Sequence, residues 1–216
     1  MNFNILLSII LLILIIATDL YFIRTSQEKK RFWTKPFIIP LIILLYIQVA
    51  KQVNLSLIIA LMFSFLGDFF LLFSEKKLFF YSGLFSFLTS HILYIYTFTG
   101  DISLKFIPLF SYLLIIPYLI YAWIFLVKLK PYLSHYLIPV ILYIITIMGM
   151  SYTSLLRFWA TQGYHFWLPF IGSLFFVFSD SLLAIRNFKY KRKKGWVMVM
   201  LTYILGQLFI VIGFTG

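Results

Sequence analysis

Apolar residues in this chain fall in long runs that are separated by short polar segments. A helix of about 17–25 apolar residues is long enough to cross the hydrocarbon core of a bilayer. Eight runs are candidates for such spans, at residues 3–23, 36–50, 55–73, 78–99, 105–127, 136–155, 167–186 and 196–214. The second run is short, and the end of the sixth is poorly defined. The pattern predicts an all-α bundle of eight transmembrane helices, formed by a single integral membrane domain over residues 1–216.

The first run differs from a cleaved signal peptide. It has no basic segment before it, it is longer than the apolar part of a signal peptide, and it leads directly into Asp19 and Tyr21. We therefore expect it to remain in the mature protein as a membrane span.

The composition agrees with the pattern of runs. Apolar and aromatic residues make up 63% of the chain and charged residues 11%, whereas a soluble domain has roughly half and a quarter. The chain has no cysteine, and its three histidines, His91, His135 and His165, are scattered. Disulfide scaffolds, thiolate catalysis and cysteine-ligated metals are excluded, and we expect neither a metal site nor another cofactor.

The basic residues are distributed unevenly between the two sides of the predicted bundle. Of 18 basic residues, 15 lie in or beside the loops 24–35, 74–77, 128–135 and 186–195, and the other side holds Lys51, Lys105 and Arg157. The fifteen are Arg24, Lys29, Lys30, Arg31, Lys35, Lys76, Lys77, Lys128, Lys130, Arg186, Lys189, Lys191, Arg192, Lys193 and Lys194. By the positive-inside rule these loops are cytoplasmic, and both termini lie on the opposite side.

The formal net charge of +12 is better explained by topology signals and contacts with anionic lipid than by a nucleic-acid site. We therefore expect membrane lipids as partners and no nucleic acid, and we infer no obligatory protein partner. The compact chain without a retention signal favours a bacterial inner membrane over the endoplasmic reticulum.

Three acidic residues, Asp19, Asp68 and Asp180, lie within the predicted spans. A charged carboxylate near the bilayer centre costs about 2.5–3.5 kcal/mol on insertion scales, so each of them requires an explanation. At 1.5 Å per residue, each lies roughly 6–10 Å from the cytoplasmic end of its span. We expect Asp19, beside Tyr21, to be a helix-end residue that reaches water. Asp68 and Asp180 are the candidate functional groups.

Asp68 and Asp180 have similar surroundings. Each follows a small residue and has apolar residues on both sides. His91 follows Asp68 by 23 positions, and Tyr203 follows Asp180 by the same number, each in the next span. We infer two parallel repeats, residues 1–104 and 105–216, which would bring the two aspartates together at their interface. A chance match of two short apolar strings is the alternative.

The fourth and eighth spans carry small and polar side chains at helical spacing. These are Gly83, Phe87, Ser90, His91 and Tyr94 in the fourth span, and Tyr203, Gly206, Gln207 and Gly213 in the eighth. Small residues allow helices to approach closely, and polar residues form hydrogen bonds between them. Packing explains Ser90, Gly206 and Gly213, whereas for His91 and Gln207 both a packing role and a functional role remain open.

Two carboxyl groups in one poorly solvated site do not ionise together easily, so one keeps its proton while the other is anionic. Such a pair supplies an acid and a base for hydrolysis without a metal or a covalent nucleophile. The chain contains no nucleophile elbow, zinc-protease motif or phosphate-binding glycine loop. The residues therefore indicate a membrane hydrolase, a proton-coupled transporter or lipid flippase, or a structural lipid-binding protein.

Two blocks of sequence resemble signature motifs of the YhhN-like lysoplasmalogenases. The first block comprises residues 63–72 (FSFLGDFFLL), 83–87 and 91–94, and the second comprises residues 178–184 (FSDSLLA), Thr202, Tyr203 and Gln207. Lys35 and Pro36 at the start of the second span match a further family feature. The resemblance covers the chain from about residue 33 onward. It implies hydrolysis of the sn-1 vinyl ether bond of lysoplasmalogens to a fatty aldehyde and glycerophosphoethanolamine or glycerophosphocholine.

Within this resemblance the expected catalytic residues are Asp68 and Asp180, one as general acid and the other as the group that stabilises the cation and takes a proton from water. The two roles are not assigned between them. The lysophospholipid substrate, its ether oxygen or the attacking water would be held by a group of polar residues. These are Lys35, His91, Tyr94, Tyr203 and Gln207, of which Lys35 would bind the lipid phosphate at the cytoplasmic mouth or serve as a topology signal.

Overall fold

The computed structural model describes residues 3–102, 107–190 and 196–216, and within these ranges all regular secondary structure is helical. The eight α-helices of this part are α1 (Phe3–Arg24), α2 (Lys35–Val49), α3 (Leu55–Leu71), α4 (Lys77–Thr99), α5 (Ile116–Leu129), α6 (Leu137–Leu156), α7 (Tyr164–Ala184) and α8 (Val197–Ile212). Short 3-10 turns join several of them, and a π-helical turn, η7 (Ile185–Lys189), follows α7. The all-α prediction is confirmed.

Six helical segments of the described chain are long and apolar enough to cross a membrane, and this indicates a multi-pass membrane protein. They are Phe3–Arg24, Glu28–Val49, Lys77–Thr99, Leu109–Tyr132, Ser134–Trp159 and Tyr164–Lys189. Helices α3 and α8 are also apolar but contain 17 and 16 residues. At 1.5 Å per residue they are about 25 Å long, shorter than the roughly 30 Å hydrocarbon core.

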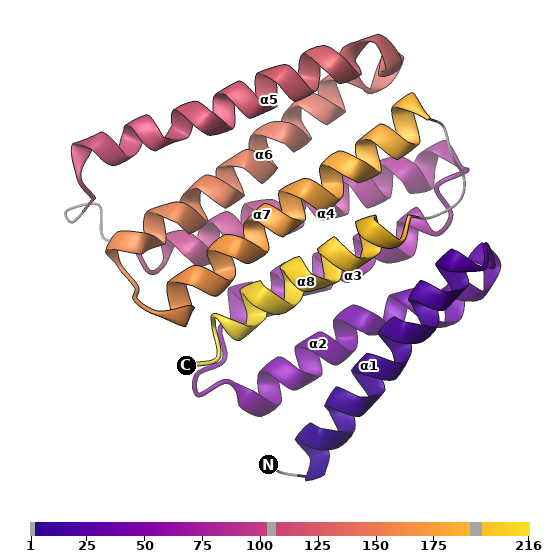
Figure 1. Cartoon of the computed structure of the whole chain (residues 1–216), viewed down its shortest axis with the longest axis horizontal. Coiled ribbons are helices and arrows are strands. Elements are labelled where there is room, and N and C mark those ends of the chain that lie inside the picture. The colour runs from indigo at the N-terminus through magenta and orange to yellow at the C-terminus, as the bar shows by residue number, and fades with distance from the viewer. Residues whose placement is uncertain (1–2, 103–106, 191–195) are drawn as a thin grey trace.

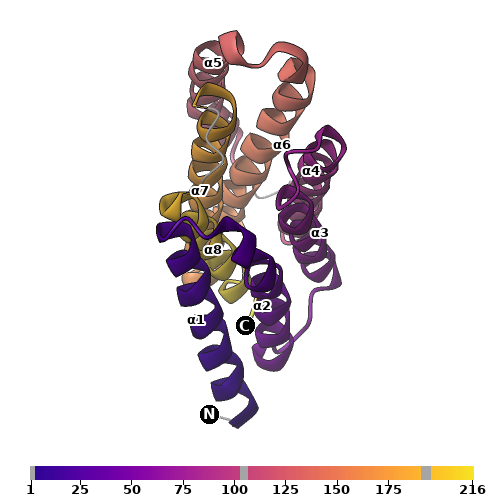
Figure 2. The same cartoon turned by 90° about the vertical axis from the view of Figure 1, so that its right-hand side faces the viewer.

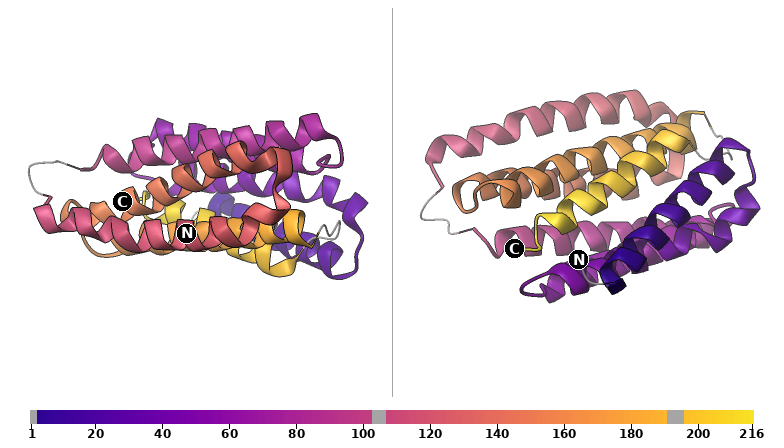
Figure 3. Two further views of the ribbon diagram at one scale, coloured as in Figure 1. Left: turned by 90° about the horizontal axis from the view of Figure 1, so that it is seen from above. Right: turned by 60° about the horizontal axis from the view of Figure 1, so that its bottom comes forward.

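The helices form two layers (Figure 2). Helices α1, α8, α7 and α5 lie in one layer, helices α2, α3 and α4 lie in the other, and α6 contacts α4, α5 and α7. The most extensive packing occurs between α3 and α4 and between α7 and α8. Seen from above, α3 and α4 lie on the side of the bundle opposite α5 (Figure 3).

Successive helices run in opposite directions, so the connections alternate between the two ends of the bundle (Figure 1). Contacts of Phe80 with Tyr136 and Phe188 join three segments at the end that holds the basic loops. At the other end, the backbone N–H of Lys51 donates to the carbonyl of Thr215. The loops predicted to be cytoplasmic therefore share one end. Five of the basic residues lie outside the described residues, namely Lys105, Lys191, Arg192, Lys193 and Lys194.

Arg157 and Asp101 form an ion pair at the end that holds the termini. The guanidinium Nη2 lies 2.8 Å from Asp101 Oδ2, and its carbon lies 4.4 Å from the ring centroid of Phe214. Arg157 is buried, so its charge requires this partner. The pair ties the segment after α4 to the ends of α6 and α8.

Glycines allow α7 and α8 to pack backbone against backbone. A Cβ atom on Gly172 would lie 2.8 Å from the carbonyl oxygen of Gly206, and a Cβ atom on Gly206 would lie 2.9 Å from the carbonyl oxygen of Gly172. Both distances are too short for real contacts, so only glycine fits at this crossing.

We expect Gly172→Ala to lower the free energy of unfolding by about 1–3 kcal/mol, because the added methyl group forces two helix backbones apart. Gly149→Ala is the matched control, since its Cβ would meet only the end of the Ile95 side chain at 3.4 Å. Denaturant unfolding in detergent, followed by circular dichroism, measures both variants. Equal stability of the two variants would contradict the packing argument.

Candidate active site

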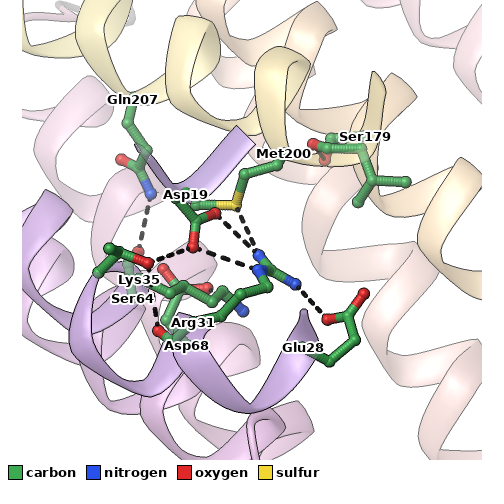
Figure 4. A network of polar contacts seen from close by, with 11 residues as sticks. Asp19, Glu28, Arg31, Lys35, Ser64, Asp68, Ser179, Met200 and Gln207 are labelled. Atoms are coloured by element: carbon green, nitrogen blue, oxygen red, sulfur yellow. Dashed lines mark hydrogen bonds and ion pairs between the residues drawn. The ribbon is translucent and has the colours of Figure 1, made fainter. Parts of the chain in front are cut away.

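Asp68 lies near the C-terminal end of α3 and forms an ion pair with Lys35, the first residue of α2 (Figure 4). Lys35 Nζ is 2.9 Å from Asp68 Oδ1, and the two side chains are 12% and 4% exposed. The Tyr203 hydroxyl of α8 lies beside the same carboxylate. It falls outside hydrogen-bonding geometry, so that Asp68 Oδ2 and the Tyr203 hydroxyl are both buried without a partner among the described residues.

Asp180 of α7 has different neighbours. The Tyr143 hydroxyl of α6 donates a hydrogen bond to Asp180 Oδ2. The Nε2 atom of His91 lies 3.9 Å from the same oxygen, which is beyond a hydrogen bond. Both ring nitrogens of His91 are buried and have no hydrogen-bond partner within the described chain. Within the described chain, no lysine or arginine forms an ion pair with Asp180.

A series of aromatic contacts connects the two carboxyl groups. The Tyr203 ring lies edge-on to Phe176 at 5.3 Å between centroids, and Phe176 lies edge-on to His91 at 5.0 Å. His91 in turn lies edge-on to Tyr143 at 5.1 Å. Asp68 and Asp180 are close enough to interact electrostatically. The structure thus brings side chains of six helices to one buried region.

Tyr94 and Gln207 belong to a separate hydrogen-bond network. The Tyr94 hydroxyl donates to Gln207 Oε1 at 2.5 Å, and Gln207 Nε2 donates to Ser64 Oγ at 3.0 Å. Ser64 also bonds with Ser90 at 2.7 Å. Because these buried groups satisfy one another, the geometry supports a packing role that joins α8 to α3 one turn before Asp68. A direct contact of Tyr94 or Gln207 with a substrate remains a prediction.

An apolar cavity lies beside Asp180, between α4, α5, α6 and α7. Its lining is almost entirely apolar, and the cavity is partly open to the surroundings. Phe87, Ile144 and Val177 are among its lining residues, and Asp180 is the only acidic or basic side chain that lines it within the described chain. An apolar group that enters this cavity meets a carboxyl group.

Asp19 is fully buried, so the expectation that it reaches water is wrong. Asp19 Oδ1 accepts hydrogen bonds from Arg31 Nε at 3.2 Å and from Thr34 Oγ1 at 2.7 Å, and Arg31 Nη2 lies 3.0 Å from Asp19 Oδ2 (Figure 4). The physical reason is the position of Arg31, which lies in the short turn η1 (Glu28–Trp33) that folds back against α1. A buried carboxylate is tolerated when a hydrogen-bonded cation accompanies it.

The buried network of Asp19 leads to Lys35. Thr34 precedes Lys35 and is the residue just before α2, so the Asp19 contacts hold the start of the helix whose first side chain pairs with Asp68. The structure therefore places the Lys35 amine on Asp68 inside the bundle. At this position it does not present a free charge to a lipid phosphate.

Two polar groups of the site were missed from the sequence. Tyr143 supplies the hydrogen bond to Asp180, and the only signal was a single hydroxyl in the otherwise apolar run 137–145. Arg31 was assigned to a basic loop, although it pairs with Asp19 across the turn. No three histidine, aspartate or glutamate side chains of the described chain converge as metal ligands.

Taken together, the fold and the site define a multi-pass helical membrane protein with one buried carboxyl group, Asp68, and a second, Asp180, that lines an apolar cavity. The family model of the YhhN family matches residues 30–214, and the chain therefore belongs to the YhhN family. The family includes lysoplasmalogenases. The family prediction made from the sequence motifs is confirmed. No curated protein and no solved structure shows significant similarity to the chain.

Proposed function

We propose that this protein is a lysoplasmalogenase that hydrolyses the sn-1 vinyl ether bond of lysoplasmalogens. The observation that carries the proposal is the position of Asp180, a carboxyl group that lines an apolar cavity and has no lysine or arginine partner within the described chain. Asp68, paired with Lys35, lies close enough to interact with it. Membership of the YhhN family supports the same reaction.

We further propose that all eight α-helices cross or lie within the membrane, with the basic loops in the cytoplasm and both termini opposite. The basic loops share one end of the bundle, as the positive-inside rule requires. Each predicted repeat, 1–104 and 105–216, contains one closely packed pair, α3 with α4 and α7 with α8. The short helices α3 and α8 carry Asp68 and Tyr203, so the site lies between the two repeats.

The two aspartates have different environments, and this assigns their roles in the proposed mechanism. Ionised Asp180 would be an uncompensated charge in apolar surroundings, which is costly. It therefore holds a proton and acts as the general acid. Asp68 has Lys35 at 2.9 Å and stays a carboxylate, which stabilises a cation and accepts a proton.

In the proposed reaction, Asp180 donates its proton to the outer alkene carbon of the vinyl ether, and an oxocarbenium ion forms at the carbon bonded to oxygen. Water adds to that carbon and transfers a proton toward Asp68. The resulting hemiacetal collapses to a fatty aldehyde and the glycerol hydroxyl, and the proton left at Asp68 restores the acid form of Asp180. The buried, unpartnered groups of His91 and Tyr203 are placed to hold the water.

An assay with two lipids tests this function. The purified protein is expected to release aldehyde from an alkenyl lysophospholipid and none from the matching alkyl ether, which lacks the carbon that must be protonated. A proton-coupled transporter or lipid flippase would instead move lipid across sealed vesicles without forming aldehyde. A structural lipid-binding protein would bind both lipids and keep that function with asparagine at both acidic positions. Either of these outcomes would overturn the proposal.

A further inference from the structure

The cavity beside Asp180 reaches the π-helical turn at the end of α7. Asn187 and Phe188 of η7 line the same cavity as Asp180. Single π-helical turns are rare and are frequently found at functional sites. The turn therefore forms the end of the cavity that faces the basic loops.

Arg186 of this turn has a charge that no acid of the described chain neutralises through a direct ion pair. Its Nε donates to Asn187 Oδ1 at 3.0 Å, and the side chain is partly buried. Arg31 is close enough to interact with it electrostatically and adds positive potential, which Glu28 partly offsets. The bond to Asn187 therefore links the Arg186 guanidinium to a residue that lines the cavity.

The spacing along α7 and η7 is similar to the distance between the vinyl ether and the phosphate of a lysoplasmalogen. Asn187 follows Asp180 by seven positions, which corresponds to about 10 Å along a helix axis. Three bonds of an extended chain cover roughly 3.3–3.6 Å. On this basis, the outer alkene carbon and the phosphorus atom of an extended lysoplasmalogen lie about 8 Å apart. A vinyl ether at Asp180 therefore places the phosphate at the level of this turn.

We propose that Arg186, oriented by Asn187, binds the phosphate group of the lysophospholipid. The identity of the substrate rests on the proposed function. A guanidinium group can form two parallel hydrogen bonds with phosphate oxygens, and Lys35, the other cation considered for this role, is occupied by Asp68. The alkenyl chain then lies beyond Asp180, along Ile147 and Val177 of the cavity.

The test compares Arg186→Gln, Arg186→Lys and the control Lys189→Gln. Lys189 lies in the same turn, but it is exposed and its amine lies over the Tyr190 ring. Hydrolysis is measured with an alkenyl lysophosphatidylethanolamine and with the phosphate-free 1-alkenylglycerol. We expect Arg186→Gln to raise KM for the phospholipid at least about tenfold, as loss of a charge-assisted contact does, with a small change in kcat and no change for the alkenylglycerol. Arg186→Lys should lie between Arg186→Gln and the wild type, and Lys189→Gln should match the wild type.

Binding of the unreactive alkyl lysophospholipid separates this inference from the reaction. Arg186→Gln is expected to weaken that binding by the same factor, whether or not the protein hydrolyses vinyl ethers. If the wild type releases no aldehyde but its binding of the alkyl lysophospholipid depends on Arg186, the proposed function is overturned and the phosphate site stands. Equal effects of Arg186→Gln on the phospholipid and the alkenylglycerol, or no effect on either, would overturn the phosphate site.

Discussion

Replacing Asp180 by asparagine is expected to slow aldehyde release by about 10²–10⁴-fold, the range over which a positioned general acid accelerates a reaction. An amide has nearly the shape of the carboxyl group but does not donate a proton to an alkene carbon. Tyr143 can still bond to the amide oxygen, so the packing around α6 and α7 should persist. Initial rates of aldehyde release by purified protein, with thermal unfolding as the measure of folding, check this expectation.

Ser181→Ala is the matched control for Asp180→Asn. Ser181 is the next residue along α7 and lines the same cavity, but its hydroxyl bonds with Tyr121 and with the carbonyl of Val177. We expect this variant to retain most of its activity. Near-normal aldehyde release by folded Asp180→Asn would eliminate Asp180 as the acid. In that case Asp68→Asn shows whether the other carboxyl group has that role.

The largest loss of stability is expected from Asp19→Ala. Arg31 is buried and bonds to Asp19 through two nitrogens. Removing the carboxylate leaves a buried charge whose remaining acidic partner in the described chain is Glu28. Removing one partner of a buried pair costs about 3–5 kcal/mol. Denaturant unfolding in detergent measures the loss, and aldehyde release should fall with it because Thr34 no longer anchors the start of α2.

A double variant distinguishes the buried charge from a general effect of mutating α1. In Asp19→Leu combined with Arg31→Met, neither charge remains, and an apolar replacement of a buried pair is often neutral or stabilising. We expect this variant to be more stable than Asp19→Ala. If the double variant were at least as unstable as the single one, the ion pair would not be the reason that Asp19 is needed.

The helical content and the membrane class of the protein could be predicted from the sequence because both depend on local properties. Runs such as 3–23 and 78–99 are apolar over a length that only a helix can satisfy in a bilayer, since every backbone N–H and C=O must be bonded within the segment. The described helices follow these runs closely, with α1 at Phe3–Arg24 and α4 at Lys77–Thr99. The fifth run, 105–127, corresponds to the helical segment Leu109–Tyr132, in which a 3-10 helix, η3 (Leu109–Ile115), precedes α5 at Ile116.

The pairing of charges could not be read from the same pattern. Asp19 looked like a helix-end residue because the hydropathy of α1 contains no information on what packs beside it. Only the turn after α1 brings Arg31 back to its carboxylate. Lys35 likewise looked like a basic residue at a helix end, and the packing of α2 against α3 turned it into the partner of Asp68.

By itself, then, the sequence determined an all-α membrane protein, its family motifs and the identity of its two unusual aspartates, since each of these follows from residue type and spacing along one chain. The tertiary structure alone decided that Asp68 has a cation while Asp180 faces an apolar cavity, and that Tyr143 bonds to Asp180. The physical reason is that lipid tails are as apolar as the helices, so the hydrophobic effect does not favour one helix neighbour over another within the bilayer. Their arrangement depends instead on close contacts such as Gly172 with Gly206 and on a few buried polar pairs.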